Sequence, residues 1–308
     1  MGLSLLGHAE ILPSEVTAFD HGDVDLATGH VFIAHTALGT VEVIDPAQER
    51  HIATLPGCPE ASGVLCAQHE RLVFAAARGA GALLVIDAAT HAILRRLAVG
   101  THPNGLAWAA DWQHLLVADV ADATARLVDP TQGRILATVT LPGRPRWGVY
   151  DRGRQRFLLN IREPAMVIAL HPETLENVMA ISVSVPGPHG LDIDHARDRA
   201  YVACDGGAVV ELDLTSDREV RSATIPGVPD ATWVNPQAAR LYVAIGQPGV
   251  LSVIDLDTMT EQEAVITEPG AGTTAFDVQR QQLYVFLPQT SRVAIYAERE
   301  RRSRSCSG

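Results

Sequence analysis

The sequence predicts an all-β fold, a seven-bladed β-propeller of four-stranded blades whose ring is closed by the N-terminal strand. Three sequence markers lead to this prediction, because each returns with nearly the same period along the 308-residue chain. They are a short apolar strand ending in Asp, a Gly that precedes each new unit, and a second apolar strand between the two. Four short strands in about 42 residues is the period of a propeller blade.

The strand that ends in Asp is the most regular marker. It reads VEVID, LLVID, ARLVD, VELDL and LSVID, and the fourth unit has VIALH in its place. From Asp45 to Asp255 the copies follow one another every 42 residues, and Tyr296 stands in the seventh copy, 41 residues further on. Such an Asp begins a turn, where its carboxylate accepts backbone N–H bonds. We therefore predict a structural role for these aspartates.

The other two markers share this period. Glycines stand near the end of six units, at positions 57, 100, 143, 187, 227 and 270. The second strand reads HVFIAH, RLVFAA, HLLVAD, RFLLNI, RAYVAC, RLYVAI and QLYVFL. Each unit is thus predicted as four strands joined by short turns and loops.

The ends of the chain predict how the ring closes. The seventh unit stops after RVAIYAERE without a fourth strand, whereas the N-terminus holds an unmatched strand, HAEILPSE. Residues 7–13 should therefore pair with the third strand of the last unit and remove an open sheet edge. We expect one domain over residues 1–297 and a disordered tail over 298–308. Its units are expected to begin near residues 16, 59, 101, 144, 187, 228 and 271.

Composition and charge exclude several classes of partner. The formal net charge of −12 argues against a general nucleic-acid or anionic-membrane binder. No stretch approaches the roughly 20 apolar residues of a membrane span, and the N-terminus lacks the pattern of a signal peptide. The four cysteines form no CxxC pair. We expect a cytoplasmic, monomeric protein with no nucleic acid, no membrane and no disulfide framework.

Two units carry a resemblance to a known family. GLDIDHARDRAYVACDGGAVVELDL and TWVNPQAARLYVAIGQPGVLSVIDLDT resemble the repeats of YVTN-family, YncE-like proteins. RAYVAC, RLYVAI and QLYVFL occupy the place of the Tyr-Val-x-Asn stretch of that family. The resemblance extends over residues 16–297 and implies a propeller fold, but it implies no particular activity.

The start of each innermost strand lines the mouth of the central channel in such a fold, and propeller proteins usually carry their sites there. An alignment of the units on their second strands places one residue of each unit at this level: His21, Ser62, Asn104, Trp147, His189, Asp230 and Gly272. Glu60 and His102 precede two of them at the rim. The loops after the second strands add His35, Asp119, Asn160, Arg162, Glu163, Cys204 and Asp205.

Histidines and carboxylates at these positions suggest a metal site. His21, His189 and Asp230 are the candidate ligands of a divalent ion (Zn, Ca or Mg), since imidazole and carboxylate groups suit such ions. The alternative is a polar lining whose side chains bind one another and channel water. Arg146 and Trp147 project toward the mouth as well. They either hold an anionic or planar ligand or, in the case of Trp147, plug the channel.

Two functions follow from this reading. The first is a binding propeller that recognises a small molecule or a protein at the mouth, with Asn104, Arg146, Trp147, Asp119, Arg162 and His35 as candidate binding residues. The second is a metal-dependent hydrolase or lyase in which Glu60 or His102 is the general base. HPNGLAW and PHGLDID resemble strand openings of propeller lactonases and streptogramin-type lyases, which implies Glu60, Asn104 and Asp230 as candidates for that second function. GxSxG, HExxH and P-loop motifs are all missing from the sequence.

Overall fold

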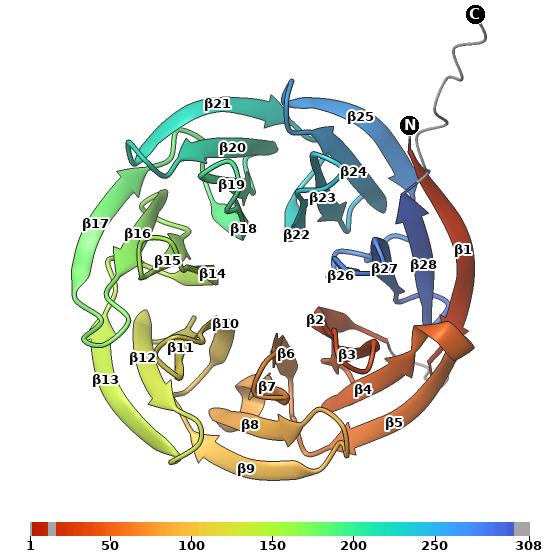
Figure 1. The fold of residues 1–308 in the computed structure, drawn as a ribbon, viewed down its shortest axis with the longest axis horizontal. Helices are drawn as coiled ribbons and strands as arrows, with labels where there is room; N and C mark the ends of the chain where they lie inside the picture. Colours follow the sequence, from red (N-terminus) through yellow and green to blue (C-terminus); the bar gives the residue numbers. More distant parts are fainter. Residues whose placement is uncertain (1, 12–16, 299–308) are drawn as a thin grey trace, which may run out of the picture.

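The protein is all-β in the computed structural model, which describes residues 2–11 and 17–298. Its strands are arranged in a ring around a common centre, and each set of four runs from a strand near the centre to a strand at the rim (Figure 1). The only helices among the described residues are two single 3-10 turns, η1 (Pro46–Gln48) and η2 (Arg78–Ala80). The ring is consistent with a β-propeller.

The strands fall into four tiers from the centre outward. The innermost tier consists of β2 (Phe19–Asp25), β6 (Ala61–Ala67), β10 (Pro103–Ala109), β14 (Pro145–Asp151), β18 (Pro188–Asp194), β22 (Pro229–Asn235) and β26 (Thr274–Asp277). The second consists of β3 (His30–His35), β7 (Leu72–Ala77), β11 (His114–Asp119), β15 (Arg156–Ile161), β19 (Arg199–Cys204), β23 (Arg240–Ile245) and β27 (Gln282–Leu287). The third consists of β4 (Thr40–Asp45), β8 (Ala82–Asp87), β12 (Thr124–Asp129), β16 (Met166–Leu170), β20 (Ala208–Asp213), β24 (Val250–Asp255) and β28 (Arg292–Glu298). The outermost consists of β5 (Arg50–Pro56), β9 (Ile93–Ala98), β13 (Arg134–Thr140), β17 (Asn177–Ser182), β21 (Arg218–Thr224), β25 (Thr260–Ile266) and β1 (Leu3–Glu10).

Five of the sheets are four-stranded and antiparallel, and the remaining strands form one eight-stranded sheet. In the eight-stranded sheet the order is β2-β3-β4-β5-β1-β28-β27-β26. Only one residue pair, Glu10 with Arg50, joins its two halves, and there the strands β1 and β5 run parallel. Each half is itself an antiparallel set of four strands.

The N-terminal strand closes the ring as the sequence predicts. β1 pairs antiparallel with β28 from Leu3 opposite Glu298 to Glu10 opposite Arg292, so the third strand of the last unit gains its missing neighbour. The strand begins and ends earlier than the predicted residues 7–13, of which residues 12 and 13 lie outside the described part. Glu298 belongs to β28, and the rest of the predicted tail, with Cys306, also lies outside the described residues.

The core lies between the faces of neighbouring sheets. Second and third strands are buried along nearly their whole length, and Val, Ala, Leu and Ile fill the layers between them. Tyr201, Tyr242 and Tyr284, the tyrosines of the RAYVAC, RLYVAI and QLYVFL stretches, have no exposed surface. Small β-branched and aliphatic residues suit this packing because both faces of each strand are covered.

The aspartates that end the third strands are turn residues, as predicted. Asp45 accepts hydrogen bonds from the backbone N–H groups of Ala47 and Gln48 and so caps the start of η1. Asp87, Asp129, Asp213 and Asp255 accept backbone N–H bonds from two or three residues further on. Because these carboxylates accept the backbone N–H bonds of the turns, their role is structural.

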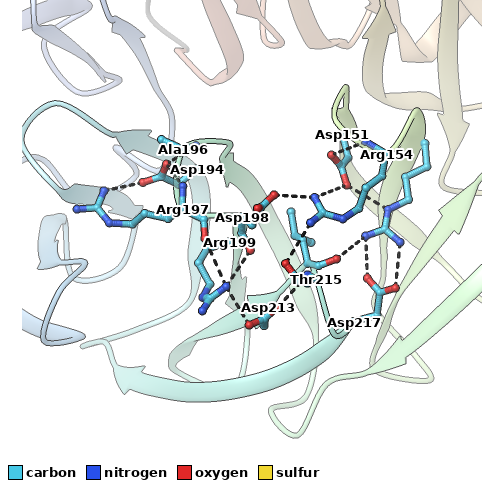
Figure 2. Close-up of polar contacts among 12 residues, drawn as sticks. Asp151, Arg154, Asp194, Ala196, Arg197, Asp198, Arg199, Asp213, Thr215 and Asp217 are labelled. Atoms are coloured by element: carbon cyan, nitrogen blue, oxygen red, sulfur yellow. Dashed lines mark hydrogen bonds and ion pairs between the residues drawn. The ribbon is translucent and has the colours of Figure 1, made fainter.

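Arginine–aspartate contacts tie neighbouring sheets together near the turns after the innermost strands (Figure 2). Arg156 Nε lies 3.1 Å from Asp151 Oδ2 in its own sheet, and its Nη2 lies 2.7 Å from Asp217 Oδ1 in the next sheet. Arg154 makes a parallel link, with Nη1 at 2.8 Å from Asp198 Oδ1. These contacts fix the angle between the two sheets on the side away from the start of the innermost strands.

No helix among the described residues is long and apolar enough to cross a membrane.

Candidate functional site

The candidate site lies at the end of the ring where the innermost strands begin, which we call the mouth. Strand pairing defines equivalent positions there, since the first residues of β2, β6, β10, β14, β18 and β22 each pair with the last residue of the second strand. The residues that follow these first residues form the ring: Asp20, Ser62, Asn104, Arg146, His189 and Asp230.

This register corrects the sequence alignment at two positions. Asp20 and Arg146 occupy the ring positions that the alignment assigned to His21 and Trp147, which stand one residue further along β2 and β14. In three other units the residue at this further position is Gly63, Gly105 or Gly190. A Cβ on any of these glycines would lie 2.1 to 2.4 Å from a backbone oxygen of the next sheet.

His21 and Trp147 stack on each other instead. Their ring centroids are 4.1 Å apart and their planes differ by 3°. The two residues belong to β2 and β14, which lie on different sides of the ring with β6 and β10 between them (Figure 1). The stack therefore spans the centre of the ring, and it favours the interpretation that Trp147 plugs the channel.

His21 lies between two carboxylates. Its Nδ1 is 2.5 Å from Asp20 Oδ1, and its Nε2 is 3.8 Å from Asp230 Oδ1. Burial by itself lowers the pKa of His21, but the hydrogen bond to Asp20 and the charges of Asp20 and Asp230 raise it above the usual value. The pKa of Asp20 is lowered despite its burial, chiefly by its hydrogen bond to His21 and by the charges of His21 and Arg78. The arrangement favours an imidazolium that bridges two carboxylates.

His189 repeats the pattern from β18. Its Nδ1 lies 2.8 Å from Asp205 Oδ1, while its Nε2 lies 3.2 Å from Asp230 Oδ1. Asp205 in turn accepts from Arg162, whose Nε is 2.7 Å from Oδ2. Burial raises the pKa of Asp205, but the hydrogen bond from His189 and the nearby positive charges bring it below its usual value. Asp205 thus holds the Nδ1–H of His189 and leaves Nε2 directed at the centre of the mouth.

Asp230 is the point on which both histidines converge. Its Oδ1 faces the Nε2 atoms of His21 and His189, yet this buried oxygen makes no hydrogen bond among the described residues. A buried carboxylate oxygen without a hydrogen bond is unusual, because the lost solvation is not replaced. The oxygen is therefore an available acceptor at the mouth.

Arg146 is the cation at the centre of this group. Its Nη2 contacts Nε2 of His189, and its buried Nε has no hydrogen-bond partner among the described residues. No ion pair between its guanidinium and a carboxylate occurs in the described part of the chain. Burial lowers the pKa of Arg146, partly offset by the charge of Asp230. A half-buried arginine normally pairs with a carboxylate. The positive charge of Arg146 has no such direct partner within the described ranges, so its loss of hydration is only partly compensated.

A second arginine belongs to the mouth. Arg78, the first residue of η2, donates from Nη1 to Asn104 Oδ1 at 3.2 Å, and the same Nη1 lies 3.7 Å from Asp20 Oδ2. Its Nε is 3.5 Å from Glu60 Oε2. Glu60 has a side chain 56% exposed, so this is a loose contact at the rim.

A bay adjoins the mouth beside Asp205. It has a volume of about 610 Å³. Its lining includes Arg144, Arg162, Glu163, Gly187 and Asp205. The bay is open to solvent and links the mouth network to the surface between β14–β15 and β18–β19.

Four residues predicted from the loops after the second strands lie inside the packing. His35, Asp119, Asn160 and Cys204 have no exposed surface. Asp119 accepts from the backbone N–H groups of Thr101, His102, Ala121 and Asp122, and Asn160 donates to the carbonyls of His189 and Gly190. Burial raises the pKa of Cys204 to about 12. These buried side chains support the backbone around the mouth and do not face a ligand there.

The three predicted metal ligands do come together, but not as an evident metal site. Among the described residues no group of three His, Cys, Asp or Glu side chains is arranged to hold a metal ion. The guanidinium of Arg146 contacts the nitrogen of His189 that a metal would need. The side chain of His102 is exposed, and neither His102 nor Glu60 forms an ion pair with His21, His189 or Asp230 in the described residues.

Two mouth residues were missed at the sequence level, Asp20 and Arg78. Asp20 adjoins His21, so only the strand register distinguishes which of the two faces the ring. Arg78 follows the second strand of its unit directly, as Arg162 does, so the rule that selected Arg162 would have found it. Comparison with known proteins adds no assignment to this geometry, since the chain matches no known family model and no curated protein sequence.

Proposed function

We propose that the chain is a seven-bladed β-propeller that binds a small carboxylate-bearing molecule at its mouth. The number seven counts the two halves of the eight-stranded sheet as separate blades, because a single residue pair joins them. The YVTN, YncE-like character of the repeats belongs to the same proposal and rests on the RAYVAC, RLYVAI and QLYVFL strands. The cytoplasmic location and the monomeric state stay predictions.

The observation that carries the proposal is the guanidinium of Arg146, which forms no direct ion pair with a carboxylate among the described residues. A half-buried arginine that lacks an ion pair and has an unpartnered Nε is ready to receive a planar anion through two parallel N–H bonds. Arg78 and Asn104, the latter on the neighbouring strand β10, provide further donors at the mouth. Asp230, Asp20 and Asp205 act on Arg146 through their charges, and an anion bound there would add the direct ion-pair partner that the guanidinium lacks within the described residues.

The carboxylates of the mouth indicate what else the ligand carries. Asp230 Oδ1 is a buried acceptor without a hydrogen bond, so a hydroxyl or amine next to the ligand carboxylate would satisfy it. Asp20 and Asp205 are already engaged by His21 and His189. We therefore favour hydroxy acids or amino acids over a simple carboxylate or inorganic phosphate.

Isothermal titration calorimetry with malate, glycerate, propionate and inorganic phosphate tests this proposal. We expect a hydroxy acid to bind most tightly, and Arg146→Gln to weaken it by about tenfold or more, because a charge-assisted bidentate contact is lost. The matched control is Arg152→Gln, since Arg152 is 74% exposed and, among the described residues, pairs with Asp111 alone. The proposal would be overturned if Arg146→Gln and Arg152→Gln bound the hydroxy acid equally, or if the wild type bound none of the probes.

A metal-dependent hydrolase or lyase is the alternative. The feature in its favour is that each histidine presents Nε2 to Asp230 while a carboxylate holds its Nδ1, which is the usual support of a metal-bound histidine. Zn, Ca or Mg would then displace the Arg146 side chain from His189. Elemental analysis of untagged protein decides between the two: about one equivalent of metal, lost in His189→Ala, supports the alternative. Metal well below one equivalent, with no metal-induced rise in melting temperature, rejects it.

A further inference from the structure

A second cavity lies in the centre of the ring beyond the mouth. It has a volume of about 330 Å³. Residues of β2, β6, β10, β14, β18 and β22 line it, together with the turn residues Gln68, His69, Glu70 and Ala110. Trp147 lines this cavity and also stacks on His21. The stack therefore separates this cavity, which we call the inner cavity, from the mouth.

Aromatic rings form much of the wall of the inner cavity. Trp108, Trp147, Trp233 and Tyr150 all line it. Two of the indoles are held in place through their N–H groups: Trp108 Nε1 donates to Glu70 Oε2 at 3.2 Å, and Trp233 Nε1 donates to the carbonyl of Thr274 at 3.0 Å. Fixed rings present preformed π faces, which attract cations.

The charged groups that line the inner cavity are acidic. Asp23, Asp192 and Glu70 line it, and neither Lys nor Arg does. Asp23 accepts from the N–H groups of Val24 and Cys66, and Asp192 accepts from those of Ile193 and Val234. Burial raises the pKa of each of the two aspartates to about 7, and for Asp23 the charge of Asp192 adds to the effect. Neither carboxylate forms an ion pair with a basic side chain within the described residues.

An unpartnered hydroxyl lies in the same wall. Thr232 is 6% exposed and lines the inner cavity, and its buried Oγ1 makes no hydrogen bond among the described residues. Buried polar atoms in native structures normally have a partner, which is supplied by protein, water or ligand. The hydroxyl therefore points independently to an occupant that carries a hydrogen-bonding group.

We propose that the inner cavity binds a small organic cation, an alkylated ammonium held between the tryptophan rings and the carboxylates of Asp23 and Asp192. The rings favour a diffuse cation with an apolar surface over a hydrated metal ion. The carboxylates select its charge, and Thr232 accepts or donates one hydrogen bond to a polar substituent. This site goes beyond the proposed function, because it lies on the other side of the His21–Trp147 stack and shares no side chain with the anion site.

Choline and its neutral isostere 3,3-dimethyl-1-butanol are the probes that test this proposal. They have nearly the same shape and differ in charge, so calorimetry with the full chain separates a cation site from an apolar cavity. We expect choline to bind and the isostere to bind at least about tenfold more weakly. Equal affinity of the two, or no binding of choline at millimolar concentration, would refute the cation site.

Variants locate the binding within the molecule. Asp192→Asn should weaken choline binding about tenfold or more, while Asp213→Asn, at an exposed turn, should leave it unchanged. Should Asp192→Asn fail to fold, Trp108→Phe and Trp108→Leu replace it: binding is retained with Phe and lost with Leu. Arg146→Gln should weaken carboxylate binding and preserve choline binding, so the two sites fail separately. Choline affinity that is unaffected in both Asp192→Asn and Trp108→Leu would place the cation elsewhere and overturn the proposal.

Discussion

The imidazole of His21 and the indole of Trp147 stack at 4.1 Å with their planes 3° apart, although their strands, β2 and β14, are not neighbours in the ring. A contact of this kind is made across the centre and not between adjacent sheets. It divides the central space into the mouth, with Arg146 and Asp230, and the inner cavity, with Asp23 and Asp192. The two proposed sites exist as separate sites because of this one pair.

Protonation of His21 should quench the fluorescence of Trp147. The imidazolium stacks directly on the indole, and the pKa of His21 is raised by Asp20 and Asp230 against the effect of burial. We therefore expect tryptophan emission to fall as the pH decreases, with a midpoint above 6.5. Both His21→Gln and Trp147→Phe should remove this transition, whereas Trp112→Phe should keep it. A transition that persists in His21→Gln would contradict the assignment.

The same histidine predicts how stability changes with pH. A raised pKa in the folded state means that the stabilisation from His21 is fully present below its unfolded pKa and is lost as the pH rises through the folded pKa. His21→Gln should therefore lower the free energy of unfolding more at pH 6 than at pH 9. Urea denaturation at the two pH values measures the difference, and an equal loss at both would show that the charge of His21 is not involved.

Removal of the negative charge of Glu42 should cause a large loss of stability. This carboxylate in β4 is 1% exposed, and it lies 2.8 Å from His51 Nε2 and accepts from Thr54 Oγ1 at 2.6 Å. Burial raises its pKa, but these contacts together with those of His35 and Thr40 hold it well below the usual value. Glu42→Gln should reduce the free energy of unfolding by about 3 kcal/mol at pH 7, because the buried negative charge that these hydrogen bonds stabilise is removed.

The pH dependence of the Glu42 effect has a definite sign. Since the folded pKa is depressed, the stabilisation is present above the ordinary value of 4.5 and declines as the pH falls toward the folded pKa. The gap between wild type and Glu42→Gln should narrow below pH 4.5 in urea denaturation. Glu173→Gln on the surface is the matched control and should change stability by less than about 0.5 kcal/mol. A gap that widens in acid would contradict a stabilised negative charge on Glu42.

Substitution of Arg156, which joins two neighbouring sheets, should destabilise the protein. Its side chain is 9% exposed and bridges Asp151, which is buried, to Asp217 of the next sheet. Arg156→Met leaves Asp151 in the interior with less compensation, so we expect a loss of about 3 kcal/mol. Arg152→Met, at an exposed pair with Asp111, should lose less than about 1 kcal/mol. Chemical denaturation measures both, and similar losses would show that burial of the pair does not matter.

Ring closure predicts that Ala9 is intolerant of charge. Ala9 in β1 pairs with Val293 in β28 and has no exposed surface. Ala9→Arg places an unpaired cation in the core and should lower the free energy of unfolding by about 3 kcal/mol or more, with faster amide exchange along β28. Leu6→Arg adds the same group on the same strand at a residue that is 54% exposed, and it should be tolerated. Equal effects would mean that β1 does not seal the last sheet.

Much of the fold was readable from the repeat because its causes are local. An alternating apolar strand, a turn that an Asp caps and a recurrent Gly each act within a few residues, so Asp45, Asp87, Asp129, Asp213 and Asp255 could be assigned to turns from spacing. The unmatched strand at the N-terminus, opposite a unit that lacks its fourth strand, likewise predicted the pairing of β1 with β28.

The sequence by itself thus determined the period, the strands, the closing strand and the polar character of the mouth. Only the tertiary structure decided that Asp20 and Arg146 face the ring while His21 and Trp147 stack across it, because a shift of one residue in register exchanges the side chains that point inward. It alone also brought Asp23 and Asp192 to one cavity, 169 residues apart in the chain. Contacts across the centre depend on how all the sheets close together, and no local spacing encodes that geometry.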